Sequence, residues 1–257
     1  MVKVLAVIPA RFGSTRLAGK PLALIDGKPM VRVAYESVVA TELFDDIVVA
    51  TDDERIREVI ADAGGRVVMT RADHASGTDR VAEVAQQSDA DVVVNVQGDL
   101  PFVTSALISP LVGTMCSEPS IPMATIAVPL HDRERWENPN VVKVVTDERG
   151  FALYFSRAPI PARRDRENDK SGSPAFALQH VGIYGYRRNF LLQFTSWPSG
   201  RLEAVERLEQ LRALERGARI FVATVSEGVV EVDTAEDLAR ANQIAAGPPR
   251  PRRVGEP

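Results

Sequence analysis

The sequence predicts an α/β fold, a three-layer sandwich in which helices cover both faces of a mostly parallel sheet. Two observations support this prediction. Short apolar runs alternate with amphipathic stretches of helical length through the first half of the chain, and the segment after each apolar run is polar or contains glycine. Strands that alternate with helices are joined by right-handed crossovers, which place consecutive strands parallel in one sheet.

The elements of the first half follow one another with short gaps. Strands are expected at residues 2–8, 47–51, 67–70 and 92–96, and helices at residues 30–40, 54–63 and 78–87. Pro9 ends the first strand because it lacks a backbone N–H, and Gly64 ends the second helix because glycine tolerates the backbone that follows a helix. Ligands of parallel sheets lie outside the carboxyl ends of the strands, so the loops after these strands are expected to carry the chemistry.

The second half has the alternation of antiparallel strands. Residues 123–130 and 140–161 alternate apolar and polar side chains around a turn at residues 147–150, which predicts an antiparallel hairpin beside the main sheet. The remaining expected elements are a strand at residues 180–187, helices at residues 188–195 and 201–217, a strand at residues 219–225 and a helix from Thr234 onwards.

A single domain, residues 1–245, is expected to contain all these elements. The charged loop at residues 163–175 is expected to be exposed, and the tail at residues 246–257, which is rich in proline and arginine, is expected to be disordered.

Composition argues against several classes of protein. The chain of 257 residues has a formal net charge of −4 and a pI of about 5.6, so it has no general attraction for nucleic acid or for an anionic membrane. Its one cysteine, Cys116, cannot form an internal disulfide, and no apolar run approaches the roughly 18 residues of a membrane span. No leader segment is recognisable, which predicts a cytoplasmic protein.

The loop after the first strand has the composition of a triphosphate site. It reads PARFGSTRLAGK and combines cations with small residues, namely Arg11, Gly13, Ser14, Arg16, Gly19 and Lys20. Cations and backbone N–H groups wrapped around a phosphate chain neutralise its charge. The spacing is not that of a Walker A loop. A solvated basic turn is the alternative interpretation.

Two aspartates are candidate ligands for a divalent cation. Asp99, in QGDLP, follows the fourth strand, and Asp233, in VEVDTAEDL, precedes the last helix. Mg²⁺ is a hard cation held by one or two carboxylates plus substrate phosphates. Each aspartate has an alternative role at a helix start, Asp99 before the helix that begins near Thr104 and Asp233 before the last helix. Only the pair together favours a metal site.

The segment HASGTDRVAEV also lies at a helix start. Ser76, Gly77 and Thr78 precede the helix, and Arg80 lies in its first turn. Such a loop can offer N–H groups to a phosphate or to the edge of a base. An ordinary N-cap at Thr78 is the alternative interpretation.

The strand HVGIYGYR carries polar groups on one face. Because side chains alternate along a strand, His180, Gly182, Tyr184 and Tyr186 share a face. Their polar tips suggest the wall of a cleft. A structural histidine packed beside two tyrosines is the alternative.

The helix expected at residues 201–217 has an apolar stripe with a helical period. The stripe consists of Leu202, Val205, Leu208, Leu211 and Leu214, and the residues off the stripe are Glu203, Glu206, Glu209, Gln210 and Arg212. Charged residues off a stripe are usually solvated, so most of these are expected to face water.

Taken in order, eight segments resemble the CMP-Kdo synthetase family, the 3-deoxy-manno-octulosonate (Kdo) cytidylyltransferases. They are IPARFGSTRLAGKPL, VATDDERI, HASGTDRVAEV, NVQGDLPFV, NPNVVKVVTDERGFALYFSRAPIP, HVGIYGYRRNFL, LEAVERLEQLRALE and VDTAEDL, and they run from about residue 3 to residue 242. The resemblance implies a Rossmann-like nucleotidyltransferase sheet. It also implies that residues 130–200, with their small antiparallel subdomain, contribute to the sugar-acid site and to a homodimer.

An activity and a set of site residues are implied by the same resemblance. Family enzymes transfer CMP from CTP to the anomeric hydroxyl of Kdo with Mg²⁺, release pyrophosphate and serve lipopolysaccharide biosynthesis. The residues implied to bind CTP are Ala10, Arg11, Ser14, Arg16, Lys20, Ser76, Gly77, Thr78, Arg80 and Gln97. Those implied to bind the sugar acid are Arg157, His180, Tyr184, Glu209 and Gln210. Asp99 and Asp233 would hold the metal, and Arg11, Lys20 and Asp99 form the implied catalytic set.

The sequence departs from the family pattern at two positions. Leu100 stands where the family usually has glutamate beside the metal-binding aspartate, and Ala18 stands where proline is common. Leu100 leaves open a second function, transfer of CMP to another acid such as an amino-substituted Kdo, a different ulosonic acid or a phosphonate of a natural-product pathway. An inactive CTP-binding module is a further alternative, although Lys20, Asp99 and Asp233 favour an enzyme.

Overall fold

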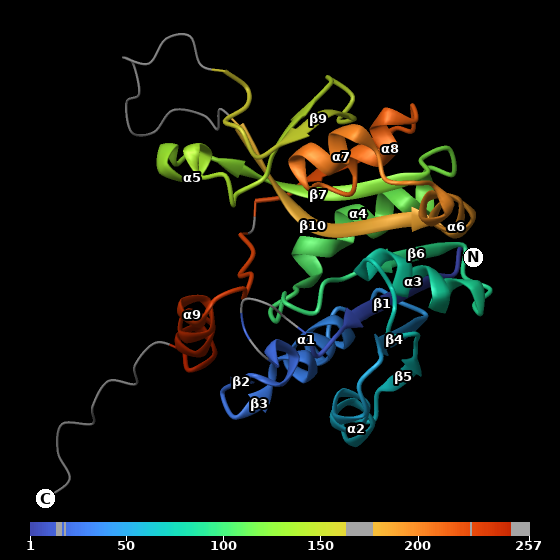
Figure 1. Cartoon of the computed structure of the whole chain (residues 1–257), viewed down its shortest axis with the longest axis vertical. Helices are drawn as coiled ribbons and strands as arrows, with labels where there is room; N and C mark the ends of the chain where they lie inside the picture. The colour runs from blue at the N-terminus through green and yellow to red at the C-terminus, as the bar shows by residue number, and fades with distance from the viewer. Residues whose placement is uncertain (14–16, 18, 163–176, 227, 248–257) are drawn as a thin grey trace, which may run out of the picture.

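One large mixed sheet organises the chain (Figure 1). The computed structural model describes residues 1–13, 17, 19–162, 177–226 and 228–247. The main path of the sheet runs in the order β11-β7-β10-β6-β1-β4-β5, and in this path β10 is antiparallel to both of its neighbours while the other pairs are parallel. The strands of this path are β1 Val4–Ala10, β4 Asp46–Thr51, β5 Arg66–Met69, β6 Val92–Asn95, β7 Met123–Leu130, β10 Ala177–Arg187 and β11 Ile220–Thr224. The predicted mostly parallel α/β sheet is therefore confirmed.

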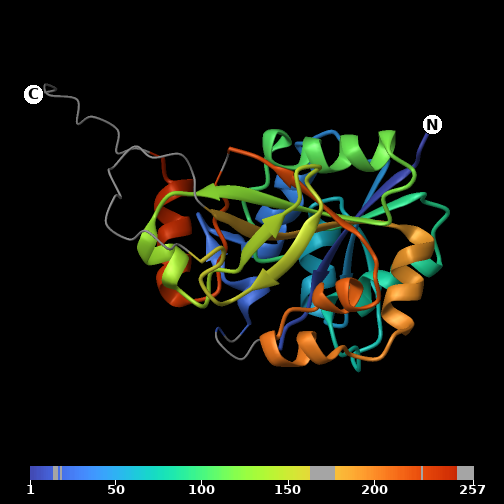
Figure 2. The ribbon, with the colours of Figure 1, turned by 90° about the horizontal axis from the view of Figure 1, so that it is seen from above.

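Helices cover both faces of this sheet, which confirms the three layers. One face carries α1 (Met30–Val39), α2 (Glu54–Asp62) and α4 (Ser105–Ser117), and the other carries α3 (Gly77–Gln86), α6 (Arg188–Ser196) and α8 (Leu211–Glu215). Seen from above, α4 in green lies on one side of the strands and the orange helices of the second half lie on the other (Figure 2).

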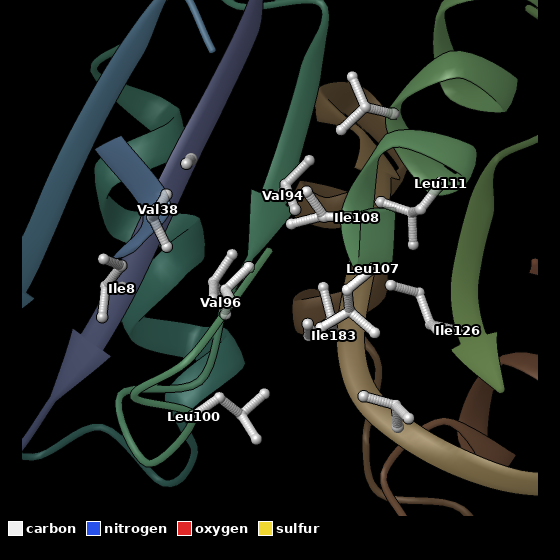
Figure 3. Close-up of a cluster of buried hydrophobic side chains, with 14 of the residues drawn as sticks. Ile8, Val38, Val94, Val96, Leu100, Leu107, Ile108, Leu111, Ile126 and Ile183 are labelled. Carbon is white, nitrogen blue, oxygen red and sulfur yellow. The ribbon is translucent and has the colours of Figure 1, made fainter. Parts of the chain in front are cut away.

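The two faces of the sheet belong to two separate hydrophobic clusters because side chains alternate along each strand. In β6, Val92 and Val94 pack with α1, α2 and α4, whereas Val93 packs with α3 and α6. Figure 3 shows Val94 beside Ile108 of α4. Both faces of the central strands are covered, so these strands read as nearly continuous apolar runs.

The predicted hairpin is present and extends the main sheet. β8 (Lys143–Thr146) and β9 (Ala152–Ser156) pair antiparallel, and β8 also pairs with the start of β10. The expectation for residues 123–130 was wrong in part, because β7 lies inside the main sheet between β10 and β11 and not in a hairpin beside it. Its side chains are buried on both faces, which is typical of an interior strand.

Several short elements carry no clear periodic signal and were not predicted. They are the 3-10 helix η1 (Lys20–Leu22), the strands β2 (Leu24–Ile25) and β3 (Lys28–Pro29), and the helix α5 (Arg133–Glu137). The last helix, α9 (Ala235–Ala245), packs near β2. Among the described residues, the helices include none that combines the length and apolarity required to cross a bilayer.

The helix expected at residues 201–217 is broken, which corrects the prediction. α7 (Arg201–Glu206) ends at Arg207, whose φ of 53° is left-handed, and α8 begins only at Leu211. Leu208 and Leu211 are buried, but Val205 is 77% exposed. A left-handed residue cannot continue a right-handed helix. Contacts of Glu206 with the end of β9 hold the break in place, and these override the periodic pattern.

We predict that Arg207→Gly raises the free energy of unfolding by about 0.5–1 kcal/mol, because glycine adopts a positive φ without the steric cost that a Cβ imposes. Urea unfolding of the variant beside Arg207→Ala measures this. In an unbroken helix the same glycine would lower stability by about 1 kcal/mol relative to alanine. A lower stability of Arg207→Gly than of Arg207→Ala would therefore contradict the break.

Candidate functional site

A cleft opens at the carboxyl ends of β1 and β6, the edge where the sequence places the chemistry. Its volume is about 270 Å³. The predicted residues that line it are Ala10, Arg11, Lys20, Ser76, Gly77, Arg80, Gln97, Asp99 and Asp233. Ser14, Arg16 and Ala18 lie outside the described residues, as do the loop 163–175 and residues 248–257 of the predicted tail.

Lys20 lies between the two candidate metal ligands. Its Nζ donates to Oδ2 of Asp99 at 2.7 Å and to Oδ1 of Asp233 at 2.8 Å. All three side chains are largely buried, with exposed fractions of 12%, 24% and 21%. Burial lowers the pKa of Lys20, but the two carboxylates outweigh it and the pKa is raised above its ordinary value. Three segments far apart in the sequence therefore meet at one cation.

Neither aspartate caps the helix that follows it. Thr104 is the N-cap of α4 and accepts a hydrogen bond from the N–H of Leu107. Thr234 is the N-cap of α9 and forms a capping box with Asp237. The start of α9 is therefore the ordinary one, a threonine before an acidic first turn, and neither aspartate is needed as a cap; both carboxylates line the cleft instead.

A third carboxylate, which the sequence reasoning missed, lies beside this pair. Oxygen atoms of Asp99, Glu231 and Asp233 lie within 4.8 Å of one another. Glu231 is two residues before Asp233, and in extended chain such residues share a face, so this spacing was a usable signal. Three oxygen donors at this spacing suit a hard divalent cation, and the Lys20 ammonium supplies a positive charge at the same place.

Leu100 points into the core. Its side chain is 3% exposed and belongs to the cluster that contains Val96 and Leu107 (Figure 3). Asp99, the residue before it, instead directs its carboxylate to Lys20. A glutamate in the apolar position of Leu100 would carry a high desolvation cost, so leucine fits its surroundings. The departure from the family pattern leaves the cleft's own carboxylates in place.

The loop before α3 is built around a capping box. Ser76 is the N-cap, its Oγ accepts from the N–H of Asp79, and the Asp79 carboxylate accepts from the N–H of Ser76. Thr78 is therefore not the N-cap, contrary to the alternative. Arg80 is 3% exposed, bonds the hydroxyl of Thr70 and still borders the cleft.

Glycine at position 98 allows the loop after β6 to approach β1 closely. A Cβ there would lie 3.0 Å from the carbonyl O of Pro9, a contact that a side chain cannot make without a shift of the backbone. Next to it, the amide Nε2 of Gln97 donates to Oδ1 of Asn95 at 3.4 Å, an orientation assigned from hydrogen bonding. Gln97 lines the cleft, and its carbonyl oxygen Oε1 faces Gly77, where a Cβ would lie 4.0 Å from it.

Aromatic rings bring the predicted sugar-acid residues of β10 together. The rings of His180 and Tyr184 are 5.4 Å apart, those of Tyr184 and Tyr186 are 6.0 Å apart, and Phe155 of β9 meets His180 edge-on at 5.0 Å. Tyr184 and Tyr186 belong to one cluster and Val181 and Ile183 to the other, so the predicted alternation is confirmed.

His180 is held as a neutral imidazole. Its Nε2 lies 2.9 Å from Oγ1 of Thr125, which in turn lies 2.8 Å from the carbonyl O of Ile183. When the single hydroxyl proton of Thr125 is donated to that carbonyl, His180 Nε2–H donates to Thr125 and Nδ1 remains an acceptor. Burial lowers the pKa of His180 to about 3.

Glu209 and Gln210, which the resemblance implies bind the sugar acid, turn inward at the break between α7 and α8, unlike a typical solvated residue off an apolar stripe. Glu209 accepts a hydrogen bond from the hydroxyl of Thr78, and burial raises the pKa of Glu209 more than this bond lowers it. Oε1 of Glu209 and Nε2 of Gln210 are buried and have no hydrogen-bond partner in the part of the chain that the structure describes. Nη2 of Arg212 lies 3.9 Å from Oε1 of Glu209, too far for a hydrogen bond, so both buried atoms could still bond a ligand.

Arg157 lies just after β9 and is anchored by two of its three guanidinium nitrogen atoms. Nε donates to the carbonyl O of Glu206 at 2.9 Å, and Nη1 donates to the carbonyl O of Pro139 at 3.1 Å. Neither bond uses Nη2, which leaves one edge of the guanidinium for an anion. Arg157 contacts the end of α7, and Glu209 and Gln210 begin the next turn of the same connection. Arg157 therefore lies in the region that holds the other predicted sugar-acid residues.

Comparison with known proteins decides the family. The model of the cytidylyltransferase family matches residues 5–220. The chain belongs to this family. It is 50% identical over 249 residues to a 3-deoxy-manno-octulosonate cytidylyltransferase of Syntrophotalea carbinolica, a match that covers 96% of this chain and 100% of the relative. A protein of the same name from Syntrophobacter fumaroxidans is also 50% identical, over 248 residues, 95% of this chain and 98% of the relative.

Solved cytidylyltransferases and related proteins share the fold. The structure of CMP:2-keto-3-deoxy-manno-octonic acid synthetase complexed with CTP has a TM-score of 0.88 at 40% identity and covers 95% of this chain and 98% of that chain. A glucose-1-phosphate thymidylyltransferase of Bacillus anthracis, described as putative, has a TM-score of 0.67 at 16% identity, over 97% of this chain and 98% of that one, and shares the fold alone. The resemblance drawn from the motifs is thus confirmed, and the protein is a nucleotidyltransferase.

We predict that the His180 ring does not titrate in NMR spectra between pH 8 and about pH 4, since its pKa in the folded state is about 3. The unfolded chain binds a proton near pH 6.5, so the stability from neutral His180 is present above pH 6.5 and is lost toward pH 3. Between pH 6.5 and pH 3, the free energy of unfolding of the wild type should fall more steeply than that of His180→Gln, by up to about 1.4 kcal/mol per pH unit. A ring titration midpoint near 6.5 would contradict burial of a neutral ring.

Proposed function

We propose that this cytidylyltransferase transfers CMP from CTP to the anomeric hydroxyl of Kdo, giving CMP-Kdo and pyrophosphate. The observation that carries the proposal is the cleft in which Lys20 lies between Asp99 and Asp233, in a chain half identical to enzymes named for this reaction. The reaction would depend on Mg²⁺ and take place in the cytoplasm, and its product would serve lipopolysaccharide biosynthesis.

The cations of the cleft support the binding of a triphosphate. Arg11 and Lys20 border it, and the backbone at Ser76 and Gly77 lies at the N-terminus of α3, where N–H groups attract anions. In the reaction the anomeric oxygen attacks the α-phosphorus of CTP, the bond to the β-phosphate oxygen breaks, and the hydroxyl proton is lost to solvent. Arg11 and Lys20 would neutralise the negative charge that builds up on the departing pyrophosphate.

The acidic group of the cleft supports a magnesium site. Asp99 and Asp233 would hold the ion, with Glu231 close enough to add a carboxylate or an oriented water. Bound Mg²⁺ supplies a Lewis acid that polarises the phosphate and lowers the pKa of the attacking hydroxyl. Lys20 would then leave the two carboxylates and pair with the phosphates, which keeps the charge of the cleft balanced.

The sugar acid would lie beyond the cleft, beside β10 and the α7–α8 connection. Nη2 of Arg157 would pair with its carboxylate, while Nδ1 of His180, the hydroxyl of Tyr184 and the orphaned atoms of Glu209 and Gln210 would bond its hydroxyl groups. Thr78 donates to Glu209 across the boundary between the two ligands, so the nucleotide side and the sugar side are in direct contact.

We also propose that the protein forms a homodimer through the β8–β9 hairpin. β9 pairs with β8 alone among the described strands, and Leu153 on it is 63% exposed. An edge strand with an exposed apolar side chain is a surface that a second chain can cover.

Pyrophosphate release from CTP and Mg²⁺ tests the function. We expect rapid release with Kdo, and slower or no release with amino-substituted Kdo, other ulosonic acids and phosphonates. Release with one of those acids but not with Kdo would reassign the acceptor and keep the nucleotide site. CTP binding without turnover on any acid would favour the inactive module.

Asp99→Ala should lose Mg²⁺-dependent turnover by at least about a hundredfold while its thermal unfolding stays close to that of the wild type, because the carboxylate ligates the ion and Thr104 still caps α4. Asp89→Ala, which changes an exposed carboxylate that pairs with Lys3 and does not line the cleft, is the matched control. Turnover of Asp99→Ala at the wild-type rate would remove this residue from the metal site.

A further inference from the structure

Lys143 is a cation to which the proposed reaction assigns no role. It begins β8, and its side chain is fully buried, with an exposed fraction of 0%. Lysine is almost never buried in this way unless its ammonium is satisfied. Its Nζ donates to the backbone carbonyl oxygens of Asn138 at 3.0 Å, Val141 at 2.6 Å and Arg157 at 2.7 Å. These three bonds use every N–H of the ammonium, so Lys143 has no donor left for a substrate.

The three carbonyl groups come from two segments that meet at the sugar-acid region. Asn138 and Val141 lie in the connection between α5 and β8, and Arg157 lies directly after β9. β8 is the middle strand here, because Lys143 is opposite Ser156 on β9 and opposite Gln179 on β10. The next residue of β10, His180, donates its N–H to the carbonyl O of Val142 at 2.9 Å. The backbone of Lys143 thus lies between β9, which Arg157 directly follows, and β10, which carries His180.

Glu206 also holds Arg157. Its carboxylate accepts from the N–H of Arg157 at 3.0 Å and from Oγ of Ser156 at 2.6 Å. Its carbonyl O accepts from Nε of Arg157, whose Nη1 reaches Pro139 in the connection that Lys143 also binds. The backbone N–H, the backbone carbonyl and two side-chain nitrogen atoms of Arg157 are therefore all fixed.

Burying the charged ammonium of Lys143 costs free energy unless all three of its hydrogen bonds are made. Burial lowers the pKa of Lys143, the positive charge of Arg157 lowers it further, and Glu206 acts in the opposite direction. An apolar side chain in this buried position would avoid the cost of desolvating a charge. What the ammonium adds is a fixed geometry for the three carbonyl groups, and one of them belongs to Arg157 itself.

We propose that Lys143, together with Glu206, is a positioning residue that preorganises Arg157 for the carboxylate of the acidic substrate. This inference rests on the proposed function, in which Arg157 pairs with that carboxylate. Preorganisation lowers the entropic cost of binding, so its loss weakens the grip on the acid and leaves the nucleotide cleft unchanged.

The chain offers a matched control at the far end of β10. Arg187 is also a cation that donates to three backbone carbonyl groups, those of Met115, Glu118 and Ile121. These carbonyls belong to α4 and the turn after it, away from Arg157 and from the cleft residues. Lys143→Met and Arg187→Met therefore remove the same kind of contact at two different places.

The test compares steady-state kinetics of pyrophosphate release with hydrogen exchange of the free proteins. We expect Lys143→Met to raise the KM for the sugar acid about tenfold or more, as loss of a hydrogen bond to a charged group does, and to change the KM for CTP less than twofold. Arg157→Ala provides the reference for direct loss of the contact. If Lys143→Met fails to fold, Glu206→Gln is the substitute test, because it is a milder change. It should shift the KM for the sugar acid in the same direction. Exchange at residues 138–142 and 157–158 should accelerate in Lys143→Met but not in Arg187→Met.

Several results would overturn the inference. An equal rise of both KM values in Lys143→Met, an equal effect of Arg187→Met on the sugar-acid KM, or unchanged exchange beside Arg157 would each show that Lys143 serves stability alone. Absence of turnover by the wild type on every acid is a different result, because it rejects the proposed function. In that case the exchange experiment still decides whether Lys143 holds the Arg157 backbone.

Discussion

The contact of one ammonium group with two carboxylates sets the geometry of the cleft. Lys20 comes from the short helix after β1, Asp99 from the loop after β6, and Asp233 from the segment before α9. Two carboxylates this close repel each other unless a cation separates them, and partial burial strengthens both the repulsion and its relief. The sheet brings the first two segments together, because β1 and β6 are neighbours in register. The third segment, which carries Asp233, is attached by the N–H of Val232, which donates to the carbonyl O of Asp99 at 3.0 Å.

The proposed sugar-acid side depends on a different feature, the break after α7. Because Arg207 takes a left-handed conformation, the chain leaves the helix and turns Glu209 and Gln210 inward. Glu206, the residue before the break, bonds the end of β9, while Thr78 at the start of α3 bonds Glu209. One short connection therefore contacts both the hairpin that carries Arg157 and the helix that borders the nucleotide cleft. The two halves of the site are linked by hydrogen bonds between fixed backbone segments.

The sequence was sufficient to predict the secondary structure where the local hydrophobic pattern and the burial of the segment agree. The strands and helices of the first half are present within a few residues of their predicted bounds. A short continuous apolar run is typical of a strand that is buried on both faces. The face shared by Tyr184 and Tyr186 also followed from alternation alone. The approach of Asp99 to Asp233 did not, because each residue precedes a helix that it could have capped, and only the structure assigns that role to Thr104 and Thr234.

Long-range contacts explain what the sequence could not indicate. The leucine period of residues 201–217 fits an unbroken helix, and nothing local reveals that Glu206 binds residues of β9. Lys143 reads as one charged residue in an alternating strand, whereas its burial depends on three carbonyl groups brought together by folding. From composition alone, a polar side chain is expected to face water. Its structural role becomes clear only from the partners that surround it in the folded protein.

The most direct test of the cleft as a nucleotide and metal site is a titration with Mn²⁺ in place of Mg²⁺, followed by electron paramagnetic resonance with and without CTP. In the wild type, CTP should increase Mn²⁺ affinity, because in the proposed reaction the triphosphate would draw Lys20 away and would add its own oxygen ligands to those of Asp99 and Asp233. Asp233→Asn should lose most of that affinity. Equal Mn²⁺ binding by the wild type and Asp233→Asn in the presence of CTP would contradict the account.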